Sequence, residues 1–250
     1  MKGGLYMKLY LTSAIGGSVK EDGVRKPGLL LPFNGFTYFL EKDWVEGSKV
    51  LIISASPSDY ERNDLILACL REAFPMSGLS ISFMDICDDR KEYLANRIDE
   101  MDVVLLSGGH VPTQNAFFQR IGLKEKIANY HGIVIAYSAG SMNCAELVYA
   151  SPEVEGEALD PNYKRWIPGL GLTSINIFPH FEEVREELLD GMRVVEDIVF
   201  KDSFRHDIIA MNNGTFIVIE NGKHTLYGEA YRIKDGKMEQ ICQNGMSVIL

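Results

Sequence analysis

Residues 132–146, with the sequence GIVIAYSAGSMNCAE, constrain the fold more than any other stretch of this chain. The run at 133–136 is apolar and rich in β-branched residues, which is typical of a strand buried on both faces. The run stops at residues 137–140, and small and apolar residues then recur at helical spacing. The stretch therefore predicts a buried strand, a sharp turn and a helix, which is the repeating unit of an α/β sheet.

Ser138 lies in this predicted turn, and we interpret it as a candidate nucleophile. A serine at a strand-to-helix turn has its hydroxyl group held clear of the sheet edge, beside the free N–H groups of the helix start. The spacing resembles the G-x-S-x-G elbow of α/β-hydrolases, with Ala136 in the place of the first glycine. The alternative interpretation is a small turn residue or a helix cap. The choice between them depends on which other polar residues gather near this turn.

Strands and helices alternate along the first half of the chain. Apolar runs predict strands at residues 8–13, 49–54, 79–84 and 102–107, and amphipathic segments predict helices at residues 36–46, 59–73 and 90–100. This alternation, with short connections, predicts a doubly wound, mostly parallel α/β sheet with right-handed crossovers. Active sites in such sheets lie beyond the carboxyl ends of the strands.

The remaining segments are predicted from turn residues and short apolar runs. They comprise an irregular loop at 23–34, a long polar loop at 151–168, a helix at 182–199, strands at 208–211 and 215–220 around an Asn-Asn-Gly turn, and meander strands within 225–250. The meander would finish the sheet edge or form a small antiparallel appendage. No role is readable for residues 14–35.

The composition bounds the class of protein. The chain has 250 residues, of which 46% are hydrophobic, so we expect residues 1–250 to form one α/β domain with a β-rich carboxyl-terminal edge at about 205–250. A net charge of −10 without any run of Lys or Arg argues against a nucleic-acid partner. No stretch reaches about 18 apolar residues, and the start of the chain lacks the apolar core of a signal peptide, so we expect a soluble monomer or homodimer with no membrane partner. Four scattered cysteines without C-x-x-C spacing fit a cytoplasmic location.

Two glycines follow the predicted strand that ends at residue 106, in the sequence Ser-Gly-Gly-His at 107–110. Paired glycines let a backbone approach a ligand closely and present its N–H groups. With the N–H of Ala139, which follows the candidate nucleophile, the N–H of Gly109 would complete an oxyanion hole. The alternative is an ordinary turn.

His180 is the candidate general base. Residues 169–181, with the sequence GLGLTSINIFPHF, predict a strand that delivers His180 at its end. A histidine can accept a serine proton and return it to a leaving group near neutral pH. The alternative is a structural or surface histidine. No pair of histidines has metal-ligand spacing and no phosphate loop is present, so we expect neither a metal nor another cofactor.

Three motifs together, at residues 107–110, 135–141 and 169–181, resemble those of peptidase family S51, the dipeptidase E and cyanophycinase group. The resemblance extends from the first predicted strand to about residue 222. It implies a three-layer sandwich related to class I glutamine amidotransferases, with a serine at the elbow in place of cysteine. It also implies Ser138 as nucleophile, His180 as general base, and the N–H groups of Gly109 and Ala139 as the oxyanion hole.

Arg185 is the candidate substrate-binding residue that the resemblance implies. Characterised peptidases of the family favour an amino-terminal aspartate, and in dipeptidase E this preference is associated with an arginine in a Glu-Thr-Arg-Glu stretch. Residues 183–186, Glu-Val-Arg-Glu, resemble that stretch, and a guanidinium can bind a carboxylate with two hydrogen bonds. The alternative is that Arg185 pairs with glutamates on a surface helix.

The sequence departs from the family at the residue that would orient His180. An acidic residue is expected before a glycine late in the chain, and Asn213 stands there. Glu153, Glu155 and Glu157 of the long loop are the alternatives. We expect one of these glutamates, because a neutral amide orients the ring without stabilising its charge. If Asn213 holds the ring, an aspartate in its place should raise activity.

The sequence therefore predicts a cytoplasmic serine peptidase that hydrolyses short peptides through an acyl-enzyme. The family resemblance adds a possible preference for amino-terminal aspartate. Two further departures from the family are Ala136 in the elbow, a small change that the turn can accept, and Phe178 where dipeptidase E has asparagine. The second stands against a strict preference for aspartate. The alternatives are a cyanophycinase-like or esterase activity, or a noncatalytic binding protein on the same scaffold.

Overall fold

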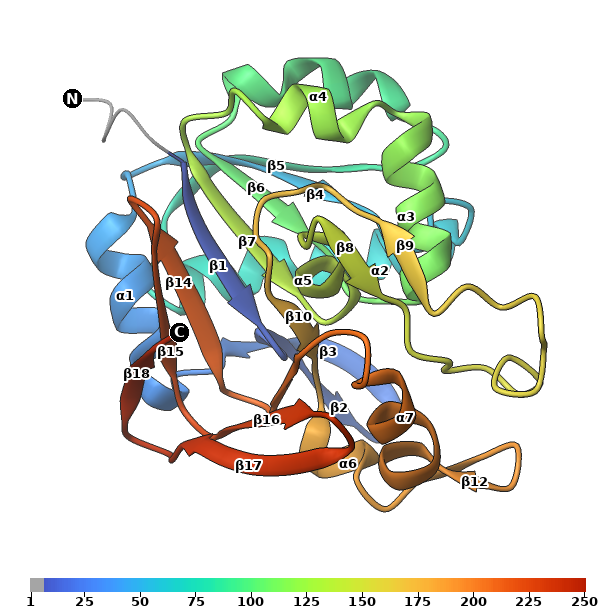
Figure 1. Ribbon diagram of the computed structural model, residues 1–250. Helices are drawn as coiled ribbons and strands as arrows, with labels where there is room; N and C mark the ends of the chain where they lie inside the picture. Colours follow the sequence, from blue (N-terminus) through green and yellow to red (C-terminus); the bar gives the residue numbers. More distant parts are fainter. Residues whose placement is uncertain (1–6) are drawn as a thin grey trace.

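The computed structural model describes residues 7–250, and two β-sheets dominate it (Figure 1). The larger sheet has eight strands in the order β18-β15-β14-β1-β7-β6-β4-β5. Its parallel strands are β1 (Lys8–Thr12), β4 (Ser48–Ile53), β5 (Ile81–Cys87), β6 (Val103–Leu106) and β7 (Ile133–Tyr137). Its antiparallel edge consists of β14 (Phe216–Glu220), β15 (Lys223–Tyr227) and β18 (Ser247–Ile249). The mostly parallel α/β sheet predicted from the sequence is confirmed.

Helices cover both faces of this sheet, which makes three layers. In β4, Val50 and Ile52 point to one face and Leu51 and Ile53 to the other, because side chains alternate along a strand. The first pair packs with α1 (Phe36–Asp43) and α2 (Tyr60–Met76). The second pair packs with the 3-10 helix η2 (Glu92–Glu100), α3 (Val111–Arg120) and α4 (Leu123–Ile127). Burial on both faces explains the continuous apolar runs of these strands.

The smaller sheet has four strands in the order β10-β13-β16-β17, and it lies beside the carboxyl-terminal edge of the larger one (Figure 1). Its strands are β10 (Asn176–Phe178), β13 (Ile208–Met211), β16 (Ala230–Lys234) and β17 (Lys237–Cys242). The tail combines the two arrangements that the sequence left as alternatives, since β15 and β18 extend the large sheet while β16 and β17 join the small one.

The strands on either side of the Asn-Asn-Gly turn do not form the hairpin that the sequence suggested. β13 belongs to the small sheet and β14 to the large sheet. Residues 212–215 make a tight turn, closed by a hydrogen bond from the N–H of Thr215 to the carbonyl oxygen of Asn212 (3.0 Å). This turn therefore carries the chain from one sheet to the other and places Asn213 where the two sheets meet.

Two segments fold as hairpins where the sequence suggested other structure. Residues 16–30, expected to be largely a loop, form β2 (Gly16–Glu21) and β3 (Val24–Leu30) around Asp22-Gly23, with φ angles of 50° and 81°. Such paired positive φ angles are those of a tight hairpin turn, which Asp-Gly favours.

The prediction of a single helix at 182–199 is also wrong. Its place is taken by α6 (Phe181–Val184), the small hairpin of β11 (Leu188–Leu189) and β12 (Met192–Arg193), the π-helix η3 (Val194–Val199) and α7 (Phe200–Asp202). Another Asp-Gly pair, Asp190-Gly191, makes the hairpin turn with φ angles of 53° and 77°.

The remaining elements are short. η1 (Phe33–Gly35) precedes α1, and α5 (Ala139–Asn143) follows β7. β8 (Leu147–Tyr149) pairs with β9 (Trp166–Pro168), so the long polar loop connects two paired strands. None of the helices formed by residues 7–250 combines the length and apolar character that crossing a membrane requires.

Candidate active site

Ser138 occupies a strained turn between β7 and α5. Its backbone angles are φ 52° and ψ −123°, a region that costs a non-glycine residue about 1–3 kcal/mol. The N–H of Ser138 donates to the carbonyl oxygen of Thr12 (3.0 Å), and its carbonyl oxygen accepts from the N–H of Met142 (3.1 Å). The strained strand-to-helix turn predicted from the sequence is confirmed.

Two neighbours of Ser138 hold this turn in place. The buried hydroxyl group of Ser141 accepts from the N–H of Thr12 (3.0 Å) and lies within donating distance of the carbonyl oxygens of Thr12 (2.9 Å) and Ala136 (2.7 Å). At Gly140, a Cβ atom would come 2.3 Å from the carbonyl oxygen of Leu106, so only glycine lets α5 pack this closely on β6. Hydrogen bonds and close packing together therefore maintain the strain.

His180 lies beside Ser138, as the sequence predicts. It follows β10 and has a left-handed backbone (φ 55°, ψ 31°), held by a hydrogen bond from its N–H to the hydroxyl oxygen of Ser13 (2.7 Å). Its Nε2 atom is 3.0 Å from the Oγ atom of Ser138. Sequence reasoning missed Ser13, although it directly follows the carboxyl end of β1, where site residues are expected in such sheets.

Asn213 is the residue that orients the His180 ring. Its Oδ1 atom is 2.8 Å from Nδ1 of His180, and its Nδ2 group donates to Oε1 of Glu183. A carboxylate can only accept hydrogen bonds, so the amide nitrogen of Asn213 faces Glu183 and its oxygen faces His180. Nδ1 of His180 must then carry the hydrogen, and Nε2 is left free to accept the Ser138 proton.

The expectation that a loop glutamate orients His180 is wrong. Oε1 of Glu157 is 2.8 Å from Nε2 of His110, and its Oε2 accepts from the N–H groups of Glu153 (2.9 Å) and Val154 (3.0 Å). Within residues 7–250, no hydrogen bond joins a glutamate of this loop to His180. The loop instead folds back on itself and on His110.

The glycines at 108 and 109 allow the backbone to approach the nucleophile. A Cβ atom on Gly108 would lie 2.9 Å from Cβ of Ser138, and one on Gly109 would lie 2.8 Å from Cβ of Ala55. In the part of the chain that the structure describes, the N–H groups of Gly109 and Ala139 have no protein acceptor. Two free N–H groups beside a serine can bind a developing oxyanion.

Arg185 lies on the surface after α6. Its side chain is 50% exposed, with its Nε atom 3.8 Å from a carboxylate oxygen of Glu186 and its guanidinium 5.9 Å from the centre of the Phe181 ring. The structure records no contact between Arg185 and Ser138 or His180. Its role as a substrate clamp therefore stays a prediction.

The long polar loop contains a group that titrates near neutral pH. Glu153 is an exposed residue, but the protein packed around its carboxyl group and the nearby Glu157 carboxylate raise the pKa of Glu153 to about 7. The surroundings of the carboxyl group, rather than the exposure of the whole residue, determine its titration. The Asp190 carboxylate also binds this loop, because its two oxygens accept from the N–H groups of Gly156 (2.7 Å) and Ala158 (3.1 Å).

We expect Glu153→Gln to stabilise the protein at pH 8 but not at pH 4. Because the folded-state pKa of Glu153 is raised from 4.5 to about 7, the folded state binds more protons in this window, and stability falls as pH rises through it. Glutamine does not titrate, so the variant does not lose stability in this way as pH rises. Solvent screening keeps the expected gain at pH 8 to about 1–3 °C in Tm, measured by thermal unfolding. Glu155→Gln is the matched control, and an equal gain in both variants would contradict the prediction.

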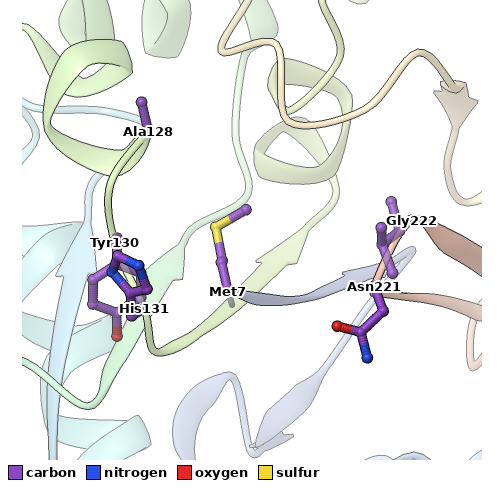
Figure 2. A pocket seen from close by; sticks show the side chains of 7 residues that line it. Met7, Ala128, Tyr130, His131, Asn221 and Gly222 are labelled. Atoms are coloured by element: carbon purple, nitrogen blue, oxygen red, sulfur yellow. The ribbon is translucent and has the colours of Figure 1, made fainter. Parts of the chain in front are cut away.

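An open pocket lies far from these residues. It has a volume of about 280 Å³ and is lined by Met7, Ala128, Tyr130, His131, Ile219, Asn221 and Gly222 (Figure 2). It lies at the amino ends of β1 and β7, where Lys8 pairs with Ile133, whereas Ser138 follows the carboxyl end of β7. The chemistry of Ser138 and His180, not the size of this pocket, therefore identifies the candidate site. In residues 7–250, no three His, Cys, Asp or Glu side chains converge where a metal ion could bind.

Comparisons with known proteins agree with this fold. Two crystal structures share the fold at 16% sequence identity. One is a peptidase from an acI-B1 Actinobacterium (TM-score 0.67, covering 98% of this chain and 97% of that one). The other is a protein provisionally named peptidase E from Listeria monocytogenes EGD-e (TM-score 0.59, covering 94% and 99%). No curated protein matches the chain.

The match to a family is more specific than the shared fold. The sequence model described as peptidase family S51 matches residues 36–227, a range that contains Ser138, His180 and Asn213. Because this range covers more than half of the sequence, the chain belongs to peptidase family S51, a family of serine-type peptidases.

Proposed function

We propose that this serine peptidase hydrolyses short peptides through an acyl-enzyme on Ser138. The observation that carries the proposal is the distance of 3.0 Å between Oγ of Ser138 and Nε2 of His180, in a turn whose strain exposes the hydroxyl group. The free N–H groups of Gly109 and Ala139 support it, because they supply the oxyanion hole that acyl transfer requires.

In the proposed reaction, Oγ of Ser138 attacks the carbonyl carbon of the scissile bond while its proton passes to Nε2 of His180. The N–H groups of Gly109 and Ala139 bind the oxyanion that forms. His180 then gives the proton to the amine nitrogen as the carbon–nitrogen bond breaks, which leaves an ester on Ser138. Water, deprotonated by His180, attacks this ester, and the proton returns to Oγ as the acid product leaves.

Asn213 supports this cycle by keeping His180 in the tautomer that accepts the serine proton. The Glu183 carboxylate lies behind the amide and supplies the negative charge that asparagine lacks, one hydrogen bond further from the ring. A chain of hydrogen bonds thus joins four side chains, in the order Ser138, His180, Asn213 and Glu183.

We further propose that the substrates carry a carboxylate near the scissile bond, with Arg185 as the candidate residue that binds it. The ion pair of Arg185 with Glu186 is long (3.8 Å) and solvent-exposed, so a substrate carboxylate can replace it at little cost. The resemblance of residues 183–186 to the Glu-Thr-Arg-Glu stretch of dipeptidase E favours amino-terminal aspartate as that group.

We also propose a reducing cytoplasmic setting. All four cysteines are free and buried. Burial raises the pKa of the Cys87 thiol to about 12, so this thiol is a poor nucleophile. Free cysteines persist in reducing compartments, where disulfides are rare.

Two measurements test the proposal together. We expect the wild type to hydrolyse members of a dipeptide library that includes Asp-X and Glu-X, and a fluorophosphonate probe to add its mass to the tryptic peptide that contains Ser138. Ser138→Ala should lose both the hydrolysis and the labelling. Arg185→Ala should raise KM for acidic substrates more than for Ala-X. Cleavage that persists in Ser138→Ala would show that Ser138 is not the nucleophile. Labelling of Ser138 together with hydrolysis of esters but of no peptide would make the protein an esterase.

A further inference from the structure

We propose that Arg62 is a positioning residue that fixes the peptide group between Gly108 and Gly109, and so aims the Gly109 N–H at the oxyanion. The inference rests on the proposed function, in which that N–H binds the oxyanion. Arg62 lies in the first turn of α2, and its Nη2 atom donates to the carbonyl oxygen of Gly108 at 3.3 Å.

The carbonyl group that Arg62 binds and the N–H of Gly109 belong to the same peptide unit. This unit is planar and trans, so its C=O and N–H groups point in opposite directions. A hydrogen bond that holds the Gly108 oxygen on the α2 side therefore holds the Gly109 N–H on the other side. Arg62 sets the direction of the donor without touching the substrate.

A peptide unit between two glycines needs such a restraint. Both glycines are required by packing, since a Cβ atom on Gly108 would collide with Tyr137 and Ser138, and one on Gly109 with Ala55. Without Cβ atoms, however, the peptide unit can rotate at little steric cost. The residues that let the loop come close to Ser138 thus leave its key N–H free to turn away.

The backbone on either side is already fixed. Ser107 donates its N–H to the carbonyl oxygen of Ile53 (3.1 Å), and its own carbonyl oxygen accepts from Nε2 of Gln114 (2.7 Å). The carbonyl oxygen of His110 accepts from the N–H of Gln114 (3.0 Å). Rotation of the Gly108–Gly109 unit is therefore the freedom that remains in this loop, and Arg62 removes it.

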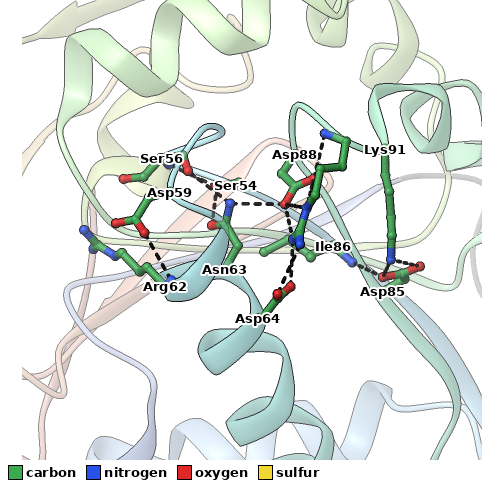
Figure 3. Close-up of polar contacts among 11 residues, drawn as sticks. Ser54, Ser56, Asp59, Arg62, Asn63, Asp64, Asp85, Ile86, Asp88 and Lys91 are labelled. Carbon is green, nitrogen blue, oxygen red and sulfur yellow. Dashed lines mark hydrogen bonds and ion pairs between the residues drawn. The ribbon is translucent and has the colours of Figure 1, made fainter.

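Arg62 is itself placed by a buried network at the start of α2 (Figure 3). Asp59 caps the helix by accepting from the N–H of Arg62 (3.1 Å). The adjacent Asn63 is buried and bonds to Ser54 (2.7 Å) and Asp88 (3.3 Å). In Figure 3 the Arg62 side chain extends away from Asn63 and Asp88. Its guanidinium donates to the carbonyl oxygen of Gly108 in the glycine loop.

The charge of Arg62 adds to the effect of its position. None of the ion pairs within residues 7–250 involves Arg62, so no carboxylate in direct contact neutralises its charge. A positive charge on the oxygen side of a peptide unit polarises it and makes its N–H a stronger donor. Arg62 therefore favours the transition state in which the oxyanion carries negative charge.

The test compares Arg62→Ala and Arg62→Lys with Arg71→Ala. Arg71 lies on the same helix and also donates to a backbone carbonyl oxygen, that of Met84 (2.7 Å), but away from the site. We expect Arg62→Ala to lower kcat roughly 10- to 100-fold with KM nearly unchanged, because a misdirected oxyanion donor weakens only the transition state. Lysine should restore part of the rate, and Arg71→Ala should behave as the wild type.

A second readout separates this inference from the proposed function. A fluorophosphonate places its phosphoryl oxygen in the oxyanion hole, so its rate of reaction with Ser138 should fall in Arg62→Ala by a similar factor even if no peptide substrate is known. A wild type that resists the probe and cleaves nothing contradicts the proposed function itself. A reactive wild type with an equally reactive Arg62→Ala overturns the inference alone. A raised KM at constant kcat, seen only with substrates that have a free carboxylate, also overturns it, because Arg62 would then bind substrate.

Discussion

Ser138→Ala, His180→Ala and the double variant are expected to lose nearly the same activity, roughly 10⁵- to 10⁶-fold in kcat, because a nucleophile and its base act as one unit. The two atoms that exchange the proton are 3.0 Å apart, so removing either side chain leaves the other without function. The residual rate would come from substrate binding and from the oxyanion hole. Single-turnover hydrolysis of the best dipeptide, followed by product chromatography, measures these rates.

The control for this prediction is Ser141→Ala. Ser141 is also a buried serine of the same turn, but its hydroxyl group bonds to the backbone of Thr12 and Ala136 and not to His180. We expect it to lower thermal stability and to retain most of the catalytic rate. If the fold-loss in kcat of the Ser138/His180 double variant equals the product of the two single losses, the two residues act independently. That result would contradict a shared proton transfer.

Much of the fold could be predicted because the parallel strands are buried on both faces. Such strands read as continuous apolar runs, and β1, β4, β6 and β7 lie where the sequence places them, within about two residues. Ser138 and His180 could be predicted for a related reason, since each follows a strand whose end is evident from the sequence. The turns of the β2–β3 and β11–β12 hairpins were missed, although both carry Asp-Gly pairs.

The residue that orients His180 could not be predicted from chemical type alone. The acid does not contact the ring but lies behind an amide, an arrangement that residue type alone does not indicate. The contact between Asn213 and Glu183 joins the crossover of the two sheets to α6, and such a tertiary contact leaves no periodic signal in the sequence. Only the positions of both sheets reveal that the amide and the carboxylate meet.

Asn213→Ala is expected to lower kcat by roughly 10²- to 10⁴-fold. Without the amide oxygen, the His180 ring loses the acceptor at 2.8 Å that fixes its tautomer, and loss of the correct tautomer costs about 10⁴-fold in the serine-protease template. An asparagine can also present its nitrogen to the ring, which is the unproductive arrangement in that template. Glu183 prevents this here, because it accepts a hydrogen bond from the amide nitrogen and so turns the oxygen toward His180.

Glu183→Gln should therefore lower kcat as well, by about 10-fold, since glutamine can pair with either end of the Asn213 amide and no longer selects the productive one. Glu186→Gln is the matched control, because this side chain is 92% exposed and lies on the same segment. Steady-state rates across pH 6–9, with thermal unfolding to verify the fold, measure the effect. A Glu183→Gln variant as active as Glu186→Gln would show that Glu183 does not set the amide orientation.

The same contact changes what an aspartate at position 213 would do. In Asn213→Asp alone, the new carboxylate meets that of Glu183, and two carboxylates in contact hold a proton between them instead of both carrying charge. The single variant should therefore gain little at neutral pH. In Asn213→Asp combined with Glu183→Gln, the glutamine amide donates to the aspartate, which then stabilises the imidazolium directly. We expect the double variant to exceed the single variant at least about 10-fold in kcat at pH 7. An Asn213→Asp single variant that already exceeds the wild type by this factor would mean that Glu183 moves away from the introduced charge, and that its contact with Asn213 has no part in orienting His180.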